Sequence, residues 1–200
     1  MIKTIFFDVG GVLLTNGWDR HSRAKAAEVF GLDADEFTKL HYAVADGFET
    51  GDISLDHYLD AAVFHTERAF SKDDFIGFMK EQSQPIPGSL ELLTELASRR
   101  GPTLATLNNE SRELNEYRIE RFGLRDSFSL FLSSCYLGVK KPDDAIYRTA
   151  VDITQHRIDE SVFIDDRPLN LECSRLLGIS SVLFESPEQL RGEMESRGLL

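Results

Sequence analysis

Five short apolar runs, separated by segments with helical spacing, constrain the fold of this chain most. The runs cover residues 3–8, 103–107, 129–133, 161–165 and 180–184. Before the second run and between the later ones, apolar residues recur every three or four positions, as in Leu90, Leu93 and Leu96. Apolar strands that alternate with amphipathic helices are typical of a parallel sheet covered on both faces. The pattern predicts an α/β fold, a three-layer sandwich around a central parallel sheet.

The same spacing predicts the inner faces of three further helices. These faces carry Leu114, Tyr117 and Phe122, then Ile146, Ala150 and Ile153, and finally Leu169, Cys173 and Leu176.

Residues 17–85 break this alternation, because helical periodicity dominates there over residues 23–30, 35–45, 55–64 and 73–81. Helix-start signals at Asp33 and Ser71, together with Gly47 and Gly51, divide the segment into about four helices. Residues 85–88, Pro-Ile-Pro-Gly, form a hinge back into the alternating pattern. We expect a core domain made of residues 1–16 and 86–200, with a helical cap inserted over residues 17–85.

Composition limits the classes of partner. A net charge of -12 disfavours binding to nucleic-acid backbones and to anionic membranes. The N-terminal stretch does not resemble a signal peptide, and no apolar run approaches the length of a membrane span. Cys135 and Cys173 lack metal-ligand spacing and fit a reducing compartment. We therefore expect a cytoplasmic monomer or homodimer that acts on a small molecule.

Polar residues follow the ends of several apolar runs. Asp8 ends the first run, Asn108 and Asn109 follow the second, and Asp165 and Asp166 end the fourth. Lys141 lies in the loop after the third run, within Gly138-Val139-Lys140-Lys141-Pro142. The carboxyl ends of parallel strands meet at one edge of a sheet, where ligands bind. We expect these side chains to form one site.

The residue types suit phosphoryl transfer to a carboxylate. A carboxylate that attacks a phosphate dianion must overcome anionic repulsion, and a divalent cation and a lysine are the natural remedy. Magnesium prefers oxygen ligands and keeps several waters, so Asp8, Asp166 and the carbonyl oxygen of Gly10 would suffice, with Asp165 as a second candidate. Lys141 could neutralise both the nucleophile and the phosphoryl oxygens.

Four segments in this order resemble the motifs of the haloacid dehalogenase superfamily, in the branch with a small helical cap after the first motif. They are residues 6–12 (Phe-Phe-Asp-Val-Gly-Gly-Val), 107–109 (Leu-Asn-Asn), 138–147, and 162–166 with Asn170 beyond. The resemblance covers essentially the whole chain and implies a Rossmann-like core. It implies that Asp8 is a nucleophile that forms an aspartyl-phosphate, that Mg²⁺ is the cofactor, and that Lys141, directly before a proline, is favoured over Lys140.

The resemblance also implies phosphate and substrate contacts. Asn108 stands where the family usually has a serine or threonine that binds a phosphate oxygen, and its amide can still donate. The backbone amides of Val9, Gly10 and Asn109 would complete the anion site. Trp18 and Arg20 lie nearest to Asp8 within the cap and are the first candidates for substrate contacts.

One departure from the family pattern is Gly10. Phosphatases of the superfamily usually carry an aspartate two positions after the nucleophile, which protonates the leaving alcohol and then activates water. A positioned acid or base contributes roughly 10²- to 10⁴-fold, or about 3 to 5 kcal/mol of barrier. We expect its absence to slow the release of poor leaving groups.

Three functions fit the sequence. The first is a magnesium-dependent phosphomonoester hydrolase acting on a small phosphorylated metabolite. The second is a 2-haloacid dehalogenase, which would use the same aspartate to displace halide without a metal. The paired acidic residues and the Gly10-Gly11 turn argue against it, because a metal site would have no role there. The third is a binding or regulatory protein in which Gly10 and Asn108 mark weakened chemistry.

Overall fold

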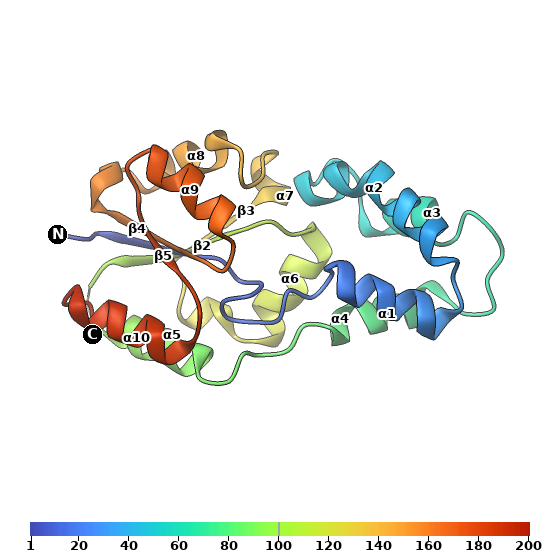
Figure 1. Cartoon of the computed structure of the whole chain (residues 1–200), viewed down its shortest axis with the longest axis horizontal. Coiled ribbons are helices and arrows are strands. Elements are labelled where there is room, and N and C mark those ends of the chain that lie inside the picture. Colours follow the sequence, from blue (N-terminus) through green and yellow to red (C-terminus); the bar gives the residue numbers. More distant parts are fainter. Residues whose placement is uncertain (100) are drawn as a thin grey trace.

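The fold is built on a five-stranded parallel sheet (Figure 1). The computed structural model describes residues 1–99 and 101–200. The strands are β1 (Thr4–Phe7), β2 (Thr103–Asn108), β3 (Leu130–Ser133), β4 (Ser161–Asp165) and β5 (Ser180–Leu183), in the spatial order β3-β2-β1-β4-β5. Each predicted apolar run forms a strand. The central strand β1 pairs with β2 on one side and with β4 on the other. Because the three strands are parallel, the polar residues at their carboxyl ends lie at one edge of the sheet.

Alternating side chains of the strands supply two separate cores. In β1, Ile5 and Phe7 pack into one apolar cluster, whereas Phe6 packs into the other. Successive side chains of a strand point to opposite faces of the sheet, so both faces must be covered. Helices α5 (Ser89–Ser98), α6 (Arg112–Arg121) and α10 (Pro187–Ser196) lie on one face, and α8 (Asp144–Thr154) and α9 (Pro168–Leu176) lie on the other (Figure 1). The predicted three-layer α/β sandwich is confirmed.

Three short helical segments complete the core. They are α7 (Ser134–Leu137) and the 3₁₀ turns η1 (Leu124–Asp126) and η2 (Ile158–Glu160).

Four helices follow β1 and lie beyond the carboxyl edge of the sheet (Figure 1). They are α1 (Arg20–Phe30), α2 (Ala34–Thr50), α3 (Leu55–Ala62) and α4 (Lys72–Glu81). Asp33 caps α2 by accepting from Glu36 N, and Ser71 caps α4 in a capping box with Asp74. Their apolar cluster includes Leu114 of α6, so it continues into the sheet domain. The expected division at residues 17 and 85 stays a prediction.

Three details of the helices differ from the expectation. Gly47 lies inside α2, which ends instead at Gly51, whose φ is +80°. In α9, Leu169 and Leu176 are exposed, and the buried face carries Asn170, Leu171 and Ser174. The helix is rotated because Asn170 turns its amide inward to a buried carboxylate of β4, an interaction that apolar spacing does not reveal. Ile153 of α8 is likewise exposed.

None of the helices in the described residues is long and apolar enough to cross a membrane.

Candidate active site

Three carboxylates meet at the carboxyl edge of β1 and β4. The pairing of Phe7 with Ile164 brings Asp8, the residue after β1, level with Asp165 at the end of β4. Each of Asp8, Asp165 and Asp166 offers an oxygen atom, and these oxygens lie within 4.8 Å of one another. The parallel register therefore brings together residues that are more than 150 positions apart in the sequence.

Lys141 lies inside this cluster, with its side chain 1% exposed. Its Nζ is 3.0 Å from Asp8 Oδ1 and 2.7 Å from Asp165 Oδ2. The side-chain amide of Asn109 holds the lysine backbone: Asn109 Nδ2 donates to Lys141 O, and Lys141 N donates to Asn109 Oδ1, both at 2.8 Å. Asn109 is thus a positioning residue for Lys141, a contact that the sequence did not indicate.

Asp165 and Asp166 differ in the partners of their oxygens. Asp165 is fully buried and accepts from Lys141 Nζ, from Asn170 Nδ2 at 3.0 Å, and from Arg167 N at 2.8 Å. Asp166 is half-buried, and its buried Oδ1 has no hydrogen-bond partner among the described residues. Asp165 therefore acts as the acceptor that orders the loop, whereas Asp166 keeps an oxygen free.

The cluster fits a divalent cation. With all three carboxylates ionised, their negative charge exceeds the single positive charge of Lys141. Burial of the unpartnered Asp166 oxygen is also unfavourable without a positive partner. Oxygen donors of this kind suit Mg²⁺. Gly11, with φ at +84°, leaves room for the Asp166 carboxylate, which would overlap a Cβ at that position. Gly10 lines the adjoining cavity, and its carbonyl remains a predicted ligand.

Burial and neighbouring charge set the pKa of the nucleophile candidate. Burial raises the pKa of Asp8 to about 7, the Lys141 ammonium opposes that rise, and the Asp165 and Asp166 carboxylates add to it. Burial, followed by the charge of Asp165, also raises the pKa of Asp166. A cation among these oxygens would offset both causes.

The structure places Asn108 differently from the expectation. Its amide Nδ2 donates to Asn115 Oδ1 of α6 at 3.1 Å, and its Oδ1 accepts from Ser133 Oγ at 2.8 Å. The side chain is 1% exposed and does not line the cavity. The two buried neighbours satisfy the amide, so Asn108 orders the end of β2 instead of facing a phosphate.

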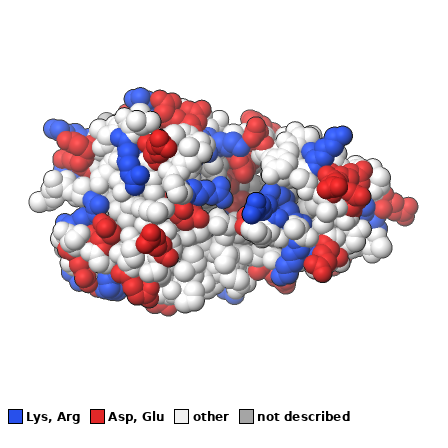
Figure 2. All heavy atoms as spheres, viewed as in Figure 1, with Lys and Arg blue, Asp and Glu red and all other residues white. Residues whose placement is uncertain are grey.

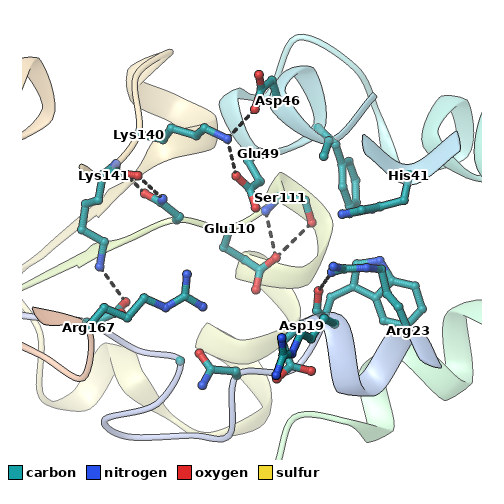
Figure 3. Close-up of a pocket in the computed structure, with 18 of the residues that line it drawn as sticks. Asp19, Arg23, His41, Asp46, Glu49, Glu110, Ser111, Lys140, Lys141 and Arg167 are labelled. Atoms are coloured by element: carbon teal, nitrogen blue, oxygen red, sulfur yellow. Dashed lines mark hydrogen bonds and ion pairs between the residues drawn. The ribbon is translucent and has the colours of Figure 1, made fainter. Parts of the chain in front are cut away.

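A cavity of about 570 Å³ lies between the sheet edge and the helices α1 and α2. The molecule has two lobes, the sheet domain and the four helices α1–α4. Figure 2 shows a hollow between these lobes, with lysine and arginine atoms gathered on both sides of it. In Figure 3, Lys141 and Arg167 project from the sheet side, and Arg23 and His41 project from the helical side. Arg167, which follows the carboxylate pair directly, was missed in the sequence.

A buried ion pair lies beside Gly10. Arg118 Nη1 is 2.7 Å from Glu110 Oε2, and the side chains are 2% and 9% exposed. A Cβ at Gly10 would lie 3.6 Å from Arg118 Nη1 and 3.4 Å from Asn16 Oδ1. The guanidinium therefore stands next to the position where the family pattern has its second aspartate. The inward position of Arg118, four residues after the buried Leu114, was the signal that could have found it.

The remaining candidates lie on the helical side. Trp18 and Arg20 both line the cavity, but Trp18 is 9% exposed and its Nε1 donates to Tyr58 OH at 2.9 Å, so most of its ring belongs to the helical core. Lys140 bridges to α2 through Asp46 at 2.5 Å and Glu49 at 2.8 Å (Figure 3). Lys140 thus links the two lobes, whereas Lys141 reaches the carboxylates.

The model of the haloacid dehalogenase-like hydrolase family matches residues 2–173. The chain belongs to this family. A solved structure of a similar fold is the HAD family enzyme bt-2542 from Bacteroides thetaiotaomicron, in complex with magnesium and inorganic phosphate, with a TM-score of 0.77 at 20% identity over 92% of this chain and 95% of that one. The L-2-haloacid dehalogenase PA0810 gives a TM-score of 0.68 at 21% identity over 94% and 85% of the two chains.

Curated relatives of this haloacid dehalogenase-like hydrolase match it over regions of 72 to 211 residues, which are small parts of their own length. The pyrimidine 5'-nucleotidase YjjG of Escherichia coli (strain K12) is 37% identical over 78 residues, which are 39% of this chain and 34% of YjjG. Across the first three curated relatives, the matched region spans 13% to 34% of their length.

Proposed function

We propose that this hydrolase is a magnesium-dependent phosphomonoester hydrolase that acts on a small phosphorylated metabolite. The observation that carries the proposal is the buried Asp8 carboxylate, held by Lys141 within a cluster in which Asp166 has an unpartnered oxygen. Attack on a phosphate dianion requires a carboxylate nucleophile, a positive charge beside it and an oxygen that can bind a metal ion. Asp8, Lys141 and Asp166 supply these three groups.

Asp8 would act as the nucleophile. Its Oδ1 accepts from Val9 N at 2.8 Å and lies 3.0 Å from Lys141 Nζ, which fixes the orientation of the carboxylate. Oδ2 has no hydrogen-bond partner among residues 1–99 and 101–200. The bond between phosphorus and the ester oxygen would break as an Asp8 oxygen bonds to phosphorus, and water would then hydrolyse the aspartyl-phosphate.

Lys141 and Arg167 would neutralise the phosphoryl oxygens from the sheet side. Asp8, Asp166 and the carbonyl of Gly10 would hold Mg²⁺, which when bound supplies positive charge against the repulsion between carboxylate and phosphate. We place the phosphate-binding amides at Gly10 and Asn109, and we propose residues 17–85 as a cap that excludes bulk water from the cavity.

The comparisons support a phosphatase. The bt-2542 structure contains magnesium and phosphate, and the names of YjjG and of a Thermus thermophilus phosphoserine phosphatase, 30% identical over 106 residues, denote phosphate-ester hydrolases. The net charge of -12 favours a small ester over a nucleic acid.

A panel of phosphate esters, with p-nitrophenyl phosphate as the first member, tests the proposal. Hydrolysis should require Mg²⁺, stop with a chelator and disappear in Asp8→Asn. Hydrolysis that persists in the chelator, or that Asp8→Asn leaves unchanged, would contradict it. Phosphate binding without turnover of any ester would favour the binding or regulatory protein.

Gly10 gives the proposal a second test. No carboxylate at this position can protonate the leaving alkoxide, so esters of acidic alcohols should react faster than alkyl phosphates. Equal kcat/KM values for p-nitrophenyl and alkyl phosphates would show that another group handles the proton.

A 2-haloacid dehalogenase is the second candidate, favoured by the fold shared with PA0810. Asp8 would then displace halide from carbon, and the cluster with Asp166 would have no role. Halide release from 2-chloropropionate in the presence of a chelator would establish this activity and overturn the phosphatase.

A further inference from the structure

The helical side of the cavity holds two arginines, Arg20 and Arg23, that form no ion pair with a carboxylate of the described residues. Six of the lining residues are lysine or arginine. The lining acids besides Asp8 already have partners: Asp19 accepts from His21 N and Ser22 N, Asp46 and Glu49 pair with Lys140, and Glu110 pairs with Arg118. The guanidinium groups of Arg20 and Arg23 are therefore available to a molecule that enters.

Arg23 of α1 is the cation best placed on that side. It is half-buried, its Nη1 donates to Trp18 O at 2.6 Å, and its Cζ lies 6.0 Å from the centre of the Tyr42 ring. No carboxylate oxygen of the described residues lies within 4.0 Å of its guanidinium nitrogens. A guanidinium has five N–H donors in a planar fork that matches carboxylate and phosphate oxygens, and here one of them is used within the chain.

His41 of α2 adds a second donor. Trp18 Nε1 donates to Tyr58 OH at 2.9 Å, so the Tyr58 hydroxyl hydrogen is left to donate to His41 Nδ1 at 3.0 Å. Burial, helped by the charges of Arg23 and Lys140, lowers the pKa of His41 to about 4, which keeps the ring neutral. With Nδ1 as acceptor, the proton of a neutral imidazole is on Nε2. His41 lines the cavity, and its Nε2 has no partner in the described part of the chain.

We propose that Arg23 and His41 form a subsite for a second anionic group of the substrate, a carboxylate or a phosphate. The inference rests on the proposed function, because it takes the first phosphate to lie at Asp8. Arg167 and Lys141 serve that first group from the sheet side, and Arg23 and His41 face it across a cavity of about 570 Å³. The substrates are therefore doubly anionic small molecules, namely phosphorylated acids or bisphosphates.

Binding of phosphonates tests the subsite without need of turnover, because their carbon–phosphorus bond resists hydrolysis. Three matched series, ω-hydroxyalkyl-, ω-carboxyalkyl- and ω-phosphonoalkyl-phosphonates of increasing chain length, are titrated into the full chain with Mg²⁺ by calorimetry. At one chain length, a second anion should tighten binding by about 10-fold or more. The carboxylate and phosphonate series show which anion the subsite accepts.

Arg23→Gln should reduce this preference to about 1-fold and leave the hydroxyalkyl series unchanged. Lys25→Gln is the matched control, since Lys25 is on the same helix, is exposed and does not line the cavity. Arg23→Lys keeps the positive charge and should keep part of the preference for a second anion. This variant replaces Arg23→Gln in the titrations if Arg23→Gln does not fold.

Absence of any preference in the natural protein, or a preference that survives Arg23→Gln, overturns the inference. Because binding and hydrolysis are measured separately, a failure of the subsite is distinguishable from a failure of the phosphatase proposal. If no ester is hydrolysed but the preference is found, only the proposed function fails.

Discussion

His41→Asn should reduce the loss of folding stability that the protein suffers between pH 7 and pH 5. The folded state holds His41 neutral through burial and the charges of Arg23 and Lys140, which lower its pKa from 6.5 to about 4. Between these pH values the unfolded chain binds a proton that the folded protein does not. Stability from this residue is therefore present above pH 6.5 and is lost as pH falls toward 4. At pH 5 the loss relative to pH 7 is about 2 kcal/mol.

Urea unfolding at pH 7 and pH 5, followed by circular dichroism without Mg²⁺, measures this difference. The Oδ1 of the introduced asparagine would still accept from the Tyr58 hydroxyl, so the variant should fold, and other titrating groups cancel in the comparison. The natural protein should lose about 2 kcal/mol more than His41→Asn on going from pH 7 to pH 5. His57→Asn, at an exposed position on α3, is the control that should behave like the natural protein. Equal acid losses in the natural protein and His41→Asn would refute the neutral, buried His41.

Three further predictions concern the site. Gly11→Ala forces a Cβ into the Asp166 carboxylate at a φ of +84°. The substitution should lower the free energy of unfolding by about 1 to 3 kcal/mol and reduce the rise in Tm that Mg²⁺ causes. An unchanged rise in Tm would contradict this prediction. Arg118→Met leaves Glu110 buried without its cation and should lower the free energy of unfolding in urea by about 3 to 5 kcal/mol. Adding Glu110→Gln should recover part of this loss. A loss below about 1 kcal/mol would contradict the prediction. Gly10→Asp fits the space beside Arg118 and should raise turnover of alkyl phosphates by about 10-fold or more over Gly10→Ala, and equal rates in the two variants would count against a missing acid.

The strands and the acidic cluster were predictable because they depend on local patterns. A continuous apolar run identifies a buried strand, and the parallel arrangement then brings Asp8, Asp165 and Asp166 to one edge. The loop of Lys141 could be assigned to the same edge for the same reason.

Side-chain directions at that edge were not predictable, because partners distant in sequence decide them. Asn108 turns toward Ser133 and Asn115, which satisfy its amide, and away from the cavity. The rotation of α9 follows from the contact of Asn170 with Asp165 and not from its apolar spacing.

The pair of Glu110 with Arg118 was also missed. It joins a loop after β2 to a helix face, and charge alone does not distinguish a buried pair from two solvated residues.

Acid quenching during turnover of p-nitrophenyl phosphate, followed by mass spectrometry, tests the central claim most directly. Attack by Asp8 should be fast with this acidic leaving group, whereas hydrolysis lacks a base at Gly10, so the aspartyl-phosphate should accumulate. The peptide that contains Asp8 should gain one phosphoryl group in the presence of Mg²⁺, and Asp8→Asn should gain none. Turnover of the ester by both proteins at the same rate, with no phosphoryl group on that peptide, would contradict the assignment of Asp8 as the nucleophile.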